Sequence, residues 1–127
     1  MFKIDPITKE IKVTRGDIGC IGVQALNKDG SNYEFKKGDI VRINVFKRSD
    51  CNCVLLRKDT IVEEPCIEME INLTKDDTKI GDVIIKPTNI YLYEIELNPD
   101  THPQTIIGFD DETGEKMFTL YPEAGEK

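Results

Sequence analysis

The sequence predicts an all-β fold, an antiparallel β-sandwich of the immunoglobulin-like type with about seven or eight strands and one short helical turn. Apolar and polar residues alternate with a period of two along most of the chain, as they do in half-buried strands. Turn residues recur at intervals of roughly eight to twelve residues, the spacing of strands in sandwiches and barrels. A helix-start pattern stands out at one place only, Thr74–Asp77.

The first half of the chain is expected to hold three strands separated by glycine-containing turns. Ile11–Val13 opens the fold as an edge-like strand, and a turn at Thr14–Asp17 leads into the strand Ile18–Leu26. Asn27–Gly30 is a tight reversal, because Asp-Gly supplies the positive φ that such turns need. Asp39–Lys47 shows the clearest alternation of all. The residues expected to face the core are Ile21, Val23, Ala25, Val41, Ile43 and Val45.

Two further strands precede the helical turn. Val54–Thr60 ends before an acidic stretch, and Cys66–Leu73 alternates cleanly. Its inward residues are expected to be Ile67, Met69, Ile71 and Leu73. Thr74 can cap the backbone N–H near Asp77, and Gly81 limits the helical segment to at most two turns.

The last third of the chain contains the longest aromatic-rich strand, Asn89–Leu97, with Tyr91, Tyr93, Ile95 and Leu97 on one face. A proline-containing loop follows, and Gln104–Phe109 and Glu115–Tyr121 are expected to form a final hairpin. Residues 122–127 are polar and are expected to fray. No linker or repeat divides the chain, so residues 1–127 are expected to form one domain.

Composition excludes several function classes. The net charge is −7 and the pI about 4.8, which disfavours nucleic-acid binding because that binding depends on basic residues neutralising phosphates. No apolar run approaches membrane-spanning length, and no signal peptide is apparent. We therefore expect the four cysteines to stay reduced in the cytoplasm.

The reactive residues form no recognisable catalytic or cofactor site, so we expect neither an enzyme nor a bound cofactor. Cys51 and Cys53 are spaced too tightly for the usual zinc knuckle, and His102 is the chain's one histidine. Arg15-Gly16-Asp17 is interpreted as a tight turn. The loop Asp110–Glu115 clusters hard oxygen ligands without the spacing of an EF-hand, and whether it holds calcium weakly stays open.

An interaction surface is the remaining candidate. If one sheet face packs the core, the opposite face of the last strands would expose an apolar patch, and such patches mark protein–protein contacts. The alternative is that both faces of the central strands are buried. The candidate patch consists of Leu92, Ile106, Phe118 and Leu120.

Five segments carry a resemblance to a known family. They are Ile11–Asp17, Lys37–Arg42, Asn72–Gly81, Tyr93–Asp110 and Leu120–Glu123, and together they span nearly the whole chain. The chain resembles small tail-module structural proteins of bacteriophages and prophages of Firmicutes. It is similar to the N-terminal domain of the upper baseplate protein of siphophages.

The resemblance implies a virion structural protein that is made in the bacterial cytoplasm and then enters the particle. It implies a tail or baseplate adaptor that binds other phage structural proteins and assembles as a homo-oligomer in the particle. It carries over no catalytic residues. Nothing after Tyr121 matches the helical linker and receptor-binding head of the family, so a stand-alone adaptor or a head or neck decoration protein is also expected. A small ligand-binding β-sandwich module is the third alternative.

Overall fold

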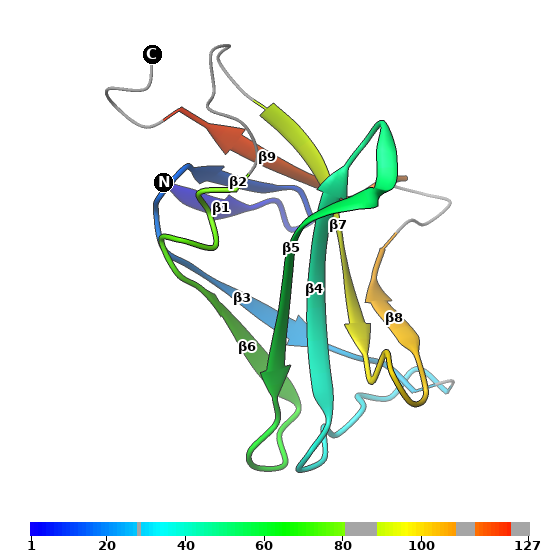
Figure 1. The fold of residues 1–127 in the computed structure, drawn as a ribbon. Helices are drawn as coiled ribbons and strands as arrows, with labels where there is room; N and C mark the ends of the chain where they lie inside the picture. Colours follow the sequence, from blue (N-terminus) through cyan, green and yellow to red (C-terminus); the bar gives the residue numbers. More distant parts are fainter. Residues whose placement is uncertain (28, 81–88, 109–113, 123–127) are drawn as a thin grey trace.

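The computed structural model describes residues 1–27, 29–80, 89–108 and 114–122 of the 127-residue chain. Nine strands lie within these ranges, and none of the described residues is helical (Figure 1). A helix able to cross a membrane is accordingly not found in the described part. The strands are β1 (Phe2–Ile4), β2 (Ile11–Thr14), β3 (Gly19–Gln24), β4 (Ile40–Lys47), β5 (Asp50–Ile61), β6 (Glu68–Leu73), β7 (Asn89–Leu97), β8 (Gln104–Ile107) and β9 (Met117–Tyr121).

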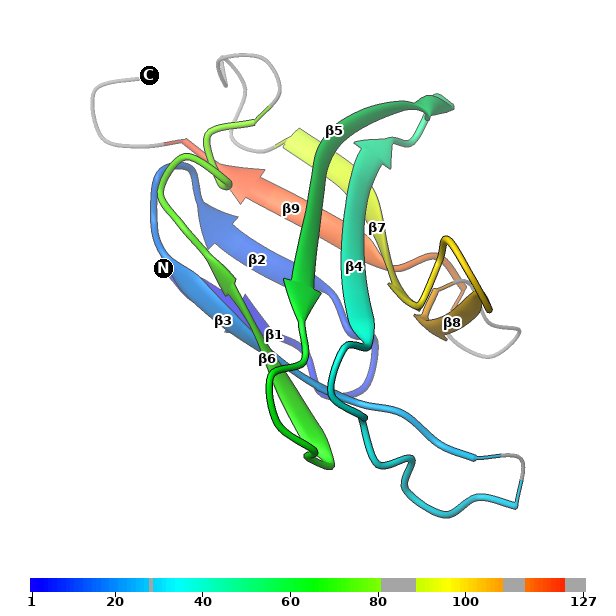
Figure 2. The ribbon, with the colours of Figure 1, turned by 60° about the horizontal axis from the view of Figure 1, so that its bottom comes forward.

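The strands form two sheets of unequal size. The large sheet has seven strands in the order β1-β2-β9-β7-β4-β5, with β8 also paired to β7, and the small sheet consists of β3 and β6. The small sheet lies across one face of the large one (Figures 1 and 2). The predicted all-β sandwich is therefore confirmed, although its seven-and-two division is more uneven than that of immunoglobulin domains.

One strand pair departs from the predicted antiparallel arrangement. β2 runs parallel to β9, with Ile11 opposite Phe118 and Val13 opposite Leu120. β2 is also not an edge, because the unpredicted β1 pairs antiparallel with its other side. A three-residue strand is too short to give a readable alternation, and periodicity identifies a strand without identifying its partner.

The predicted final hairpin is wrong. β8 and β9 do not pair with each other in the large sheet; both pair with β7. β8 lies opposite Ile95–Leu97, and β9 lies opposite Asn89–Leu92. The two strands thus pair with successive stretches of β7. Residues 110–113 of the candidate calcium loop lie outside the described residues, as does the tail from residue 123.

The core lies between the two sheets and matches the predicted inward faces of β3, β4 and β7. The inward residues of these strands are buried, namely Ile21, Val23, Val41, Ile43, Val45, Tyr91, Tyr93, Ile95 and Leu97. On β6 the prediction holds only for Ile71 and Leu73. Ile67 is 48% exposed because β6 begins one residue later, and Met69 is only partly buried.

A β-bulge shapes the edge strand β5. Val45 lies opposite Leu56 while Phe46 lies opposite Val54, which leaves Leu55 as the additional residue. Both Leu55 and Leu56 pack against the core cluster. A bulge bends a strand and breaks its regular edge, so this terminal strand is a poor template for further pairing.

The segment after β6 is a hydrogen-bonded turn in which the Thr78 N–H donates to the Thr74 carbonyl (3.3 Å), and it is too short to form a helix. Thr74 and Asp77 exchange hydrogen bonds: the Thr74 N–H donates to Asp77 Oδ2 (2.8 Å), and the Asp77 N–H donates to Thr74 Oγ1 (3.3 Å). Thr78 is fully buried. Its hydroxyl accepts from the Gly16 N–H (3.0 Å) and donates to the Asp17 carbonyl (2.8 Å). The turn after β6 is therefore hydrogen-bonded to the turn between β2 and β3, which joins the two sheets.

Lys58 links the two sheets where β5 lies beside β6. From the edge strand β5, its Nζ donates to the Asn72 carbonyl of β6 and to Asp77 Oδ2, both at 2.6 Å. Burial would raise the pKa of Asp77, but hydrogen bonds from Lys58 and Thr74 outweigh it and lower that pKa. One ammonium group thus links the large sheet, the small sheet and the turn.

The Lys58→Met variant should lose about 1–3 kcal/mol of unfolding free energy at neutral pH, because Asp77 and the Asn72 carbonyl lose a charged donor. Asp77 has a lowered pKa in the fold, so its contribution is present above its unfolded pKa of about 3.9 and is lost as the pH falls. The difference from wild type should therefore shrink in acid. Urea unfolding over a pH series measures it, with the exposed Lys37→Met as control. A loss equal in both variants would contradict the interpretation.

Candidate functional site

A row of apolar side chains crosses the face of the large sheet that points away from the small sheet. Phe46 of β4 lies opposite Val54 of β5 and Leu92 of β7, and Leu92 in turn lies opposite Met117 of β9. Residues directly opposite one another point to the same face. Phe46, Val54, Leu92 and Met117 therefore form a continuous row over four strands, which we call the outer-face row.

The outer-face row is separate from the core and partly open to solvent. None of its members belongs to the core cluster or packs against it. Val54 is 38% exposed, Phe46 and Met117 are half-buried, and Leu92 at the centre is 8% exposed. Ile90, two residues before Leu92 on the same face of β7, is 45% exposed and extends the apolar surface.

The structure corrects three of the four residues expected in the apolar patch. Leu92 does lie on the face opposite the core, as predicted. Phe118 and Leu120 are fully buried in the core, because the outward residues of β9 are Met117 and Thr119. Ile106 is the additional residue at an irregularity where β8 meets β7, and it packs against the core's edge.

The sequence does contain a signal for the missed residues. The outward positions of β4 are Arg42, Asn44 and Phe46, so the last one breaks a polar series. A large apolar residue at an outward position of a strand with a well-defined inward face indicates an apolar surface. Val54 could not be placed in this way, because the β5 bulge changes which residues share a face.

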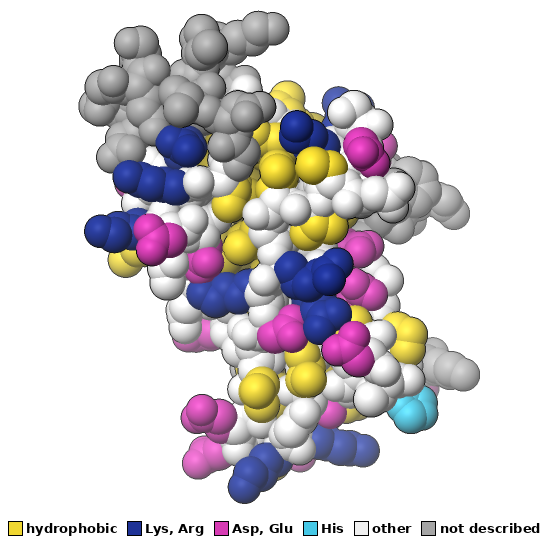
Figure 3. All heavy atoms as spheres, in the orientation of Figure 1, with side chains coloured by type: hydrophobic (Ala, Val, Ile, Leu, Met, Phe, Trp, Pro, Cys, Tyr) yellow, Lys and Arg dark blue, Asp and Glu magenta, His cyan; other side chains and the backbone are white. Residues whose placement is uncertain are grey.

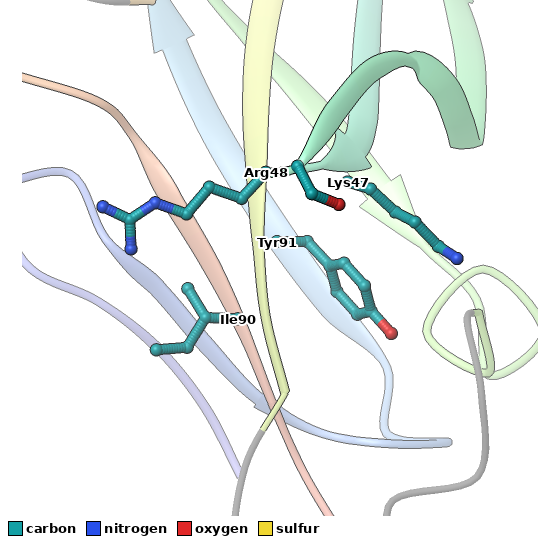
Figure 4. A pocket seen from close by; sticks show the side chains of 5 residues that line it. Lys47, Arg48, Ile90 and Tyr91 are labelled. Carbon is teal, nitrogen blue, oxygen red and sulfur yellow. The ribbon is translucent and has the colours of Figure 1, made fainter.

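A shallow pocket of about 430 Å³ lies beside the row, on the side of the β4–β5 hairpin. It is lined by Lys47, Arg48, Ser49, Ile90 and Tyr91. Arg48 and Ile90 lie on one side of β7, and Lys47 and Tyr91 lie on the other (Figure 4). Arg48 Nε also forms an ion pair with Glu115 Oε2 at 3.3 Å. Basic residues therefore border the apolar row on the hairpin side.

Ion pairs occupy the same face on the other side of the row, farther from the β4–β5 hairpin. Arg42 donates to both carboxylate oxygens of Asp59, from Nε (2.6 Å) and Nη2 (3.0 Å). It also donates to Asp100 from Nη2 (3.0 Å) and Nη1 (3.3 Å). These hydrogen bonds raise the pKa of Arg42 and lower that of Asp59. Acidic and basic side chains lie together over the middle of β4 and β5, and hydrophobic ones gather toward the hairpin (Figure 3).

A second polar chain lies between these ion pairs and the row. Arg57 Nε donates to Asn44 Oδ1, and Asn44 Nδ2 donates to Glu96 Oε1, each at 3.0 Å. Glu94 lies beside Glu96 on the same face of β7. Burial, and then the Glu96 carboxylate, raise the pKa of Glu94. The polar half of this face thus contains one carboxyl group whose charged form is disfavoured.

The other residues singled out in the sequence stay apart. Arg15–Asp17 forms the predicted tight turn, in which Gly16 has a φ of 90° and the Asp17 N–H donates to the Thr14 carbonyl. His102 is exposed in the loop before β8, and Cys20 is exposed on β3. Among the described residues, no group of three His, Cys, Asp or Glu side chains is placed to hold a metal. Comparison with protein-family models, curated proteins and solved structures found no match to the chain.

The Glu94→Gln variant should be more stable than wild type at neutral pH and equally stable in acid. A carboxyl group whose folded pKa is raised contributes stability at low pH that is lost as the pH rises through that pKa, and glutamine stays neutral throughout. Thermal unfolding at several pH values measures the difference. The exposed Glu34→Gln should show no such trend. Destabilisation of Glu94→Gln at neutral pH would show that the carboxylate is needed in its charged form.

Proposed function

We propose that the chain is a non-catalytic binding module that docks to another protein through the outer-face row. The observation that carries this proposal is the continuity of Phe46, Val54, Leu92 and Met117 across four strands on the face opposite the core. A core-forming role does not explain these side chains, since the small sheet covers the other face. Burying them against a partner would remove apolar surface from water, which is the main driving force of protein association.

The layout around the row is that of a protein interface. Such interfaces have an apolar centre and a polar rim, and their energy comes mainly from a few central residues. Here Leu92 is central, Val54 and Ile90 offer accessible apolar area, and charged residues border the row on both sides. The Arg48–Glu115 pair lies on the hairpin side, and the Arg57–Asn44–Glu96 chain lies on the other.

The resemblance to phage tail-module proteins supplies the biological setting of the proposal. We propose that the partner is another structural protein of a phage or prophage particle, and that the chain serves there as a tail or baseplate adaptor present in several copies. A place in the head or neck is the alternative setting. It would use the same docking surface and would differ only in the partner.

The Val54→Glu variant should be depleted at least about tenfold from purified particles of a lysogen that encodes the chain. An unpaired carboxylate buried in an interface costs several kcal/mol, and tenfold in affinity corresponds to 1.4 kcal/mol. Quantitative mass spectrometry of particles from induced cultures measures the amount of the chain. Separated tail and head fractions distinguish the two settings.

The matched control is Ile61→Glu, which places the same charge on the same strand, at an apolar residue that is 61% exposed and distant from the row. This variant should enter particles at the wild-type level. Both purified variants should melt close to the wild-type temperature, because both positions are exposed. Equal incorporation of wild type and Val54→Glu would refute docking through the row, and absence of the wild-type chain from particles would refute the phage setting.

A further inference from the structure

The free edge of β3 exposes backbone groups that no described residue pairs with in a sheet. The Asn72 carbonyl of β6 accepts from Lys58, so it points away from β3. Asn72 lies directly opposite Cys20, so the two form a non-hydrogen-bonded pair. In such a pair both residues direct their N–H and C=O groups away from the partner strand. By alternation along the strand, the N–H and C=O groups of Gly22 and Gln24 also point to the free edge.

This edge is accessible, and only at its Gln24 end does another described strand come near, where Gln24 shares a hollow with Gln104–Ile106 of β8. Cys20, Gly22 and Gln24 are all exposed, and for a glycine the exposed surface is the backbone itself. Other edges of the structure carry the features that prevent pairing: β5 has a bulge, β6 has a carbonyl capped by Lys58, and β1 is only three residues long. β3 has six residues with no lysine, proline or bulge.

The charge at this edge is negative. Glu68 and Glu70 lie opposite Gln24 and Gly22 and share their outward face, and neither β3 nor β6 contains a lysine or arginine. The Glu68 carboxylate extends over Gly22, since a Cβ built there would lie 2.6 Å from Glu68 Oε1. Burial is the main cause that raises the pKa of the Cys20 thiol, and the charges of Glu70 and Glu68 raise it further. This agrees with a negative electrostatic potential at the edge.

An apolar hollow of about 510 Å³ adjoins the start of β3. Ile18, Gly19 and Leu73 contribute to its lining, and Ile18 is 74% exposed. A strand added beside β3 would therefore meet a polar, acidic outward face along its length and an apolar contact at one end. Added strands gain affinity from main-chain hydrogen bonds and specificity from alternate side chains.

We propose that β3 accepts an extended segment of a partner protein as a third strand of the small sheet, with basic residues alternating with apolar ones. The basic side chains would face Glu68 and Glu70, and the apolar ones would face the sandwich. This site goes beyond the proposed function, because it lies on the small sheet, on the side of the sandwich away from the outer-face row. An adaptor needs two such surfaces to connect two neighbours.

The probe is a short synthetic peptide of alternating lysine and valine, with the glutamate–valine peptide as control, added to the full chain labelled with ¹⁵N. Amide exchange of Cys20, Gly22 and Gln24 should slow with the basic peptide, because these N–H groups gain partners. Exchange of Ile21 and Val23 should change little, since their N–H groups already bond to β6. No protection, or equal protection by the acidic peptide, would overturn the proposal.

Two variants test the two parts of the site. Gly22→Pro removes an outward N–H, and Gly22→Ala is its matched control, because its Cβ displaces the Glu68 carboxylate in the same way and keeps the N–H. Gly22→Pro should bind the basic peptide about tenfold or more weaker than Gly22→Ala, and Glu68→Lys, which reverses the charge, about tenfold or more weaker than wild type. The exposed Glu34→Lys should bind like wild type. Should Gly22→Pro fail to fold, unchanged binding by Glu68→Lys would still refute the charge requirement. Val54→Glu should retain peptide binding, so a failure of the outer-face proposal is read separately from a failure here.

Discussion

The fold depends on the packing of a two-stranded sheet against one face of a seven-stranded sheet. A two-stranded sheet is at best marginally stable in water, so β3 and β6 exist as strands because Ile21, Val23, Ile71 and Leu73 are buried against the large sheet. Polar groups then fix the distance and angle of the two layers. Lys58 bonds across one side, and the buried Thr78 hydroxyl bonds the turn after β6 to the turn before β3.

This packing also decides which surfaces remain for other molecules. The small sheet covers the core face of the large sheet, so the large sheet can offer partners its outer face and its edges. The small sheet has its own two edges, of which the one beside β5 is bridged by Lys58. The outer-face row and the edge of β3 are thus consequences of one uneven division of strands. They lie on different layers, and the two proposals assign them to different partners.

Side-chain alternation predicted the strands and their inward faces well where a strand is long and regular, as in β4 and β7. It failed where the chain breaks its own period. The β5 bulge moves Leu55 and Leu56 to the same face, and the alternation within the five residues of β9 does not by itself tell which set faces the core. Strand partners were beyond reach for a different reason: the parallel pairing of β2 with β9 joins residues about a hundred positions apart, and nothing local in the sequence records it.

The polar half of the outer face stabilises the strands that present the proposed docking surface. Arg42 is held by four hydrogen bonds to two carboxylates, and Asn44 joins Arg57 to Glu96, so β5, β4 and β7 are tied together by side chains as well as by backbone. Strands fixed in this way present Phe46, Val54 and Leu92 in a constant arrangement. A partner that binds a preorganised surface loses less conformational entropy on association. In the proposed docking, these ion pairs would hold the outer-face row in a fixed arrangement.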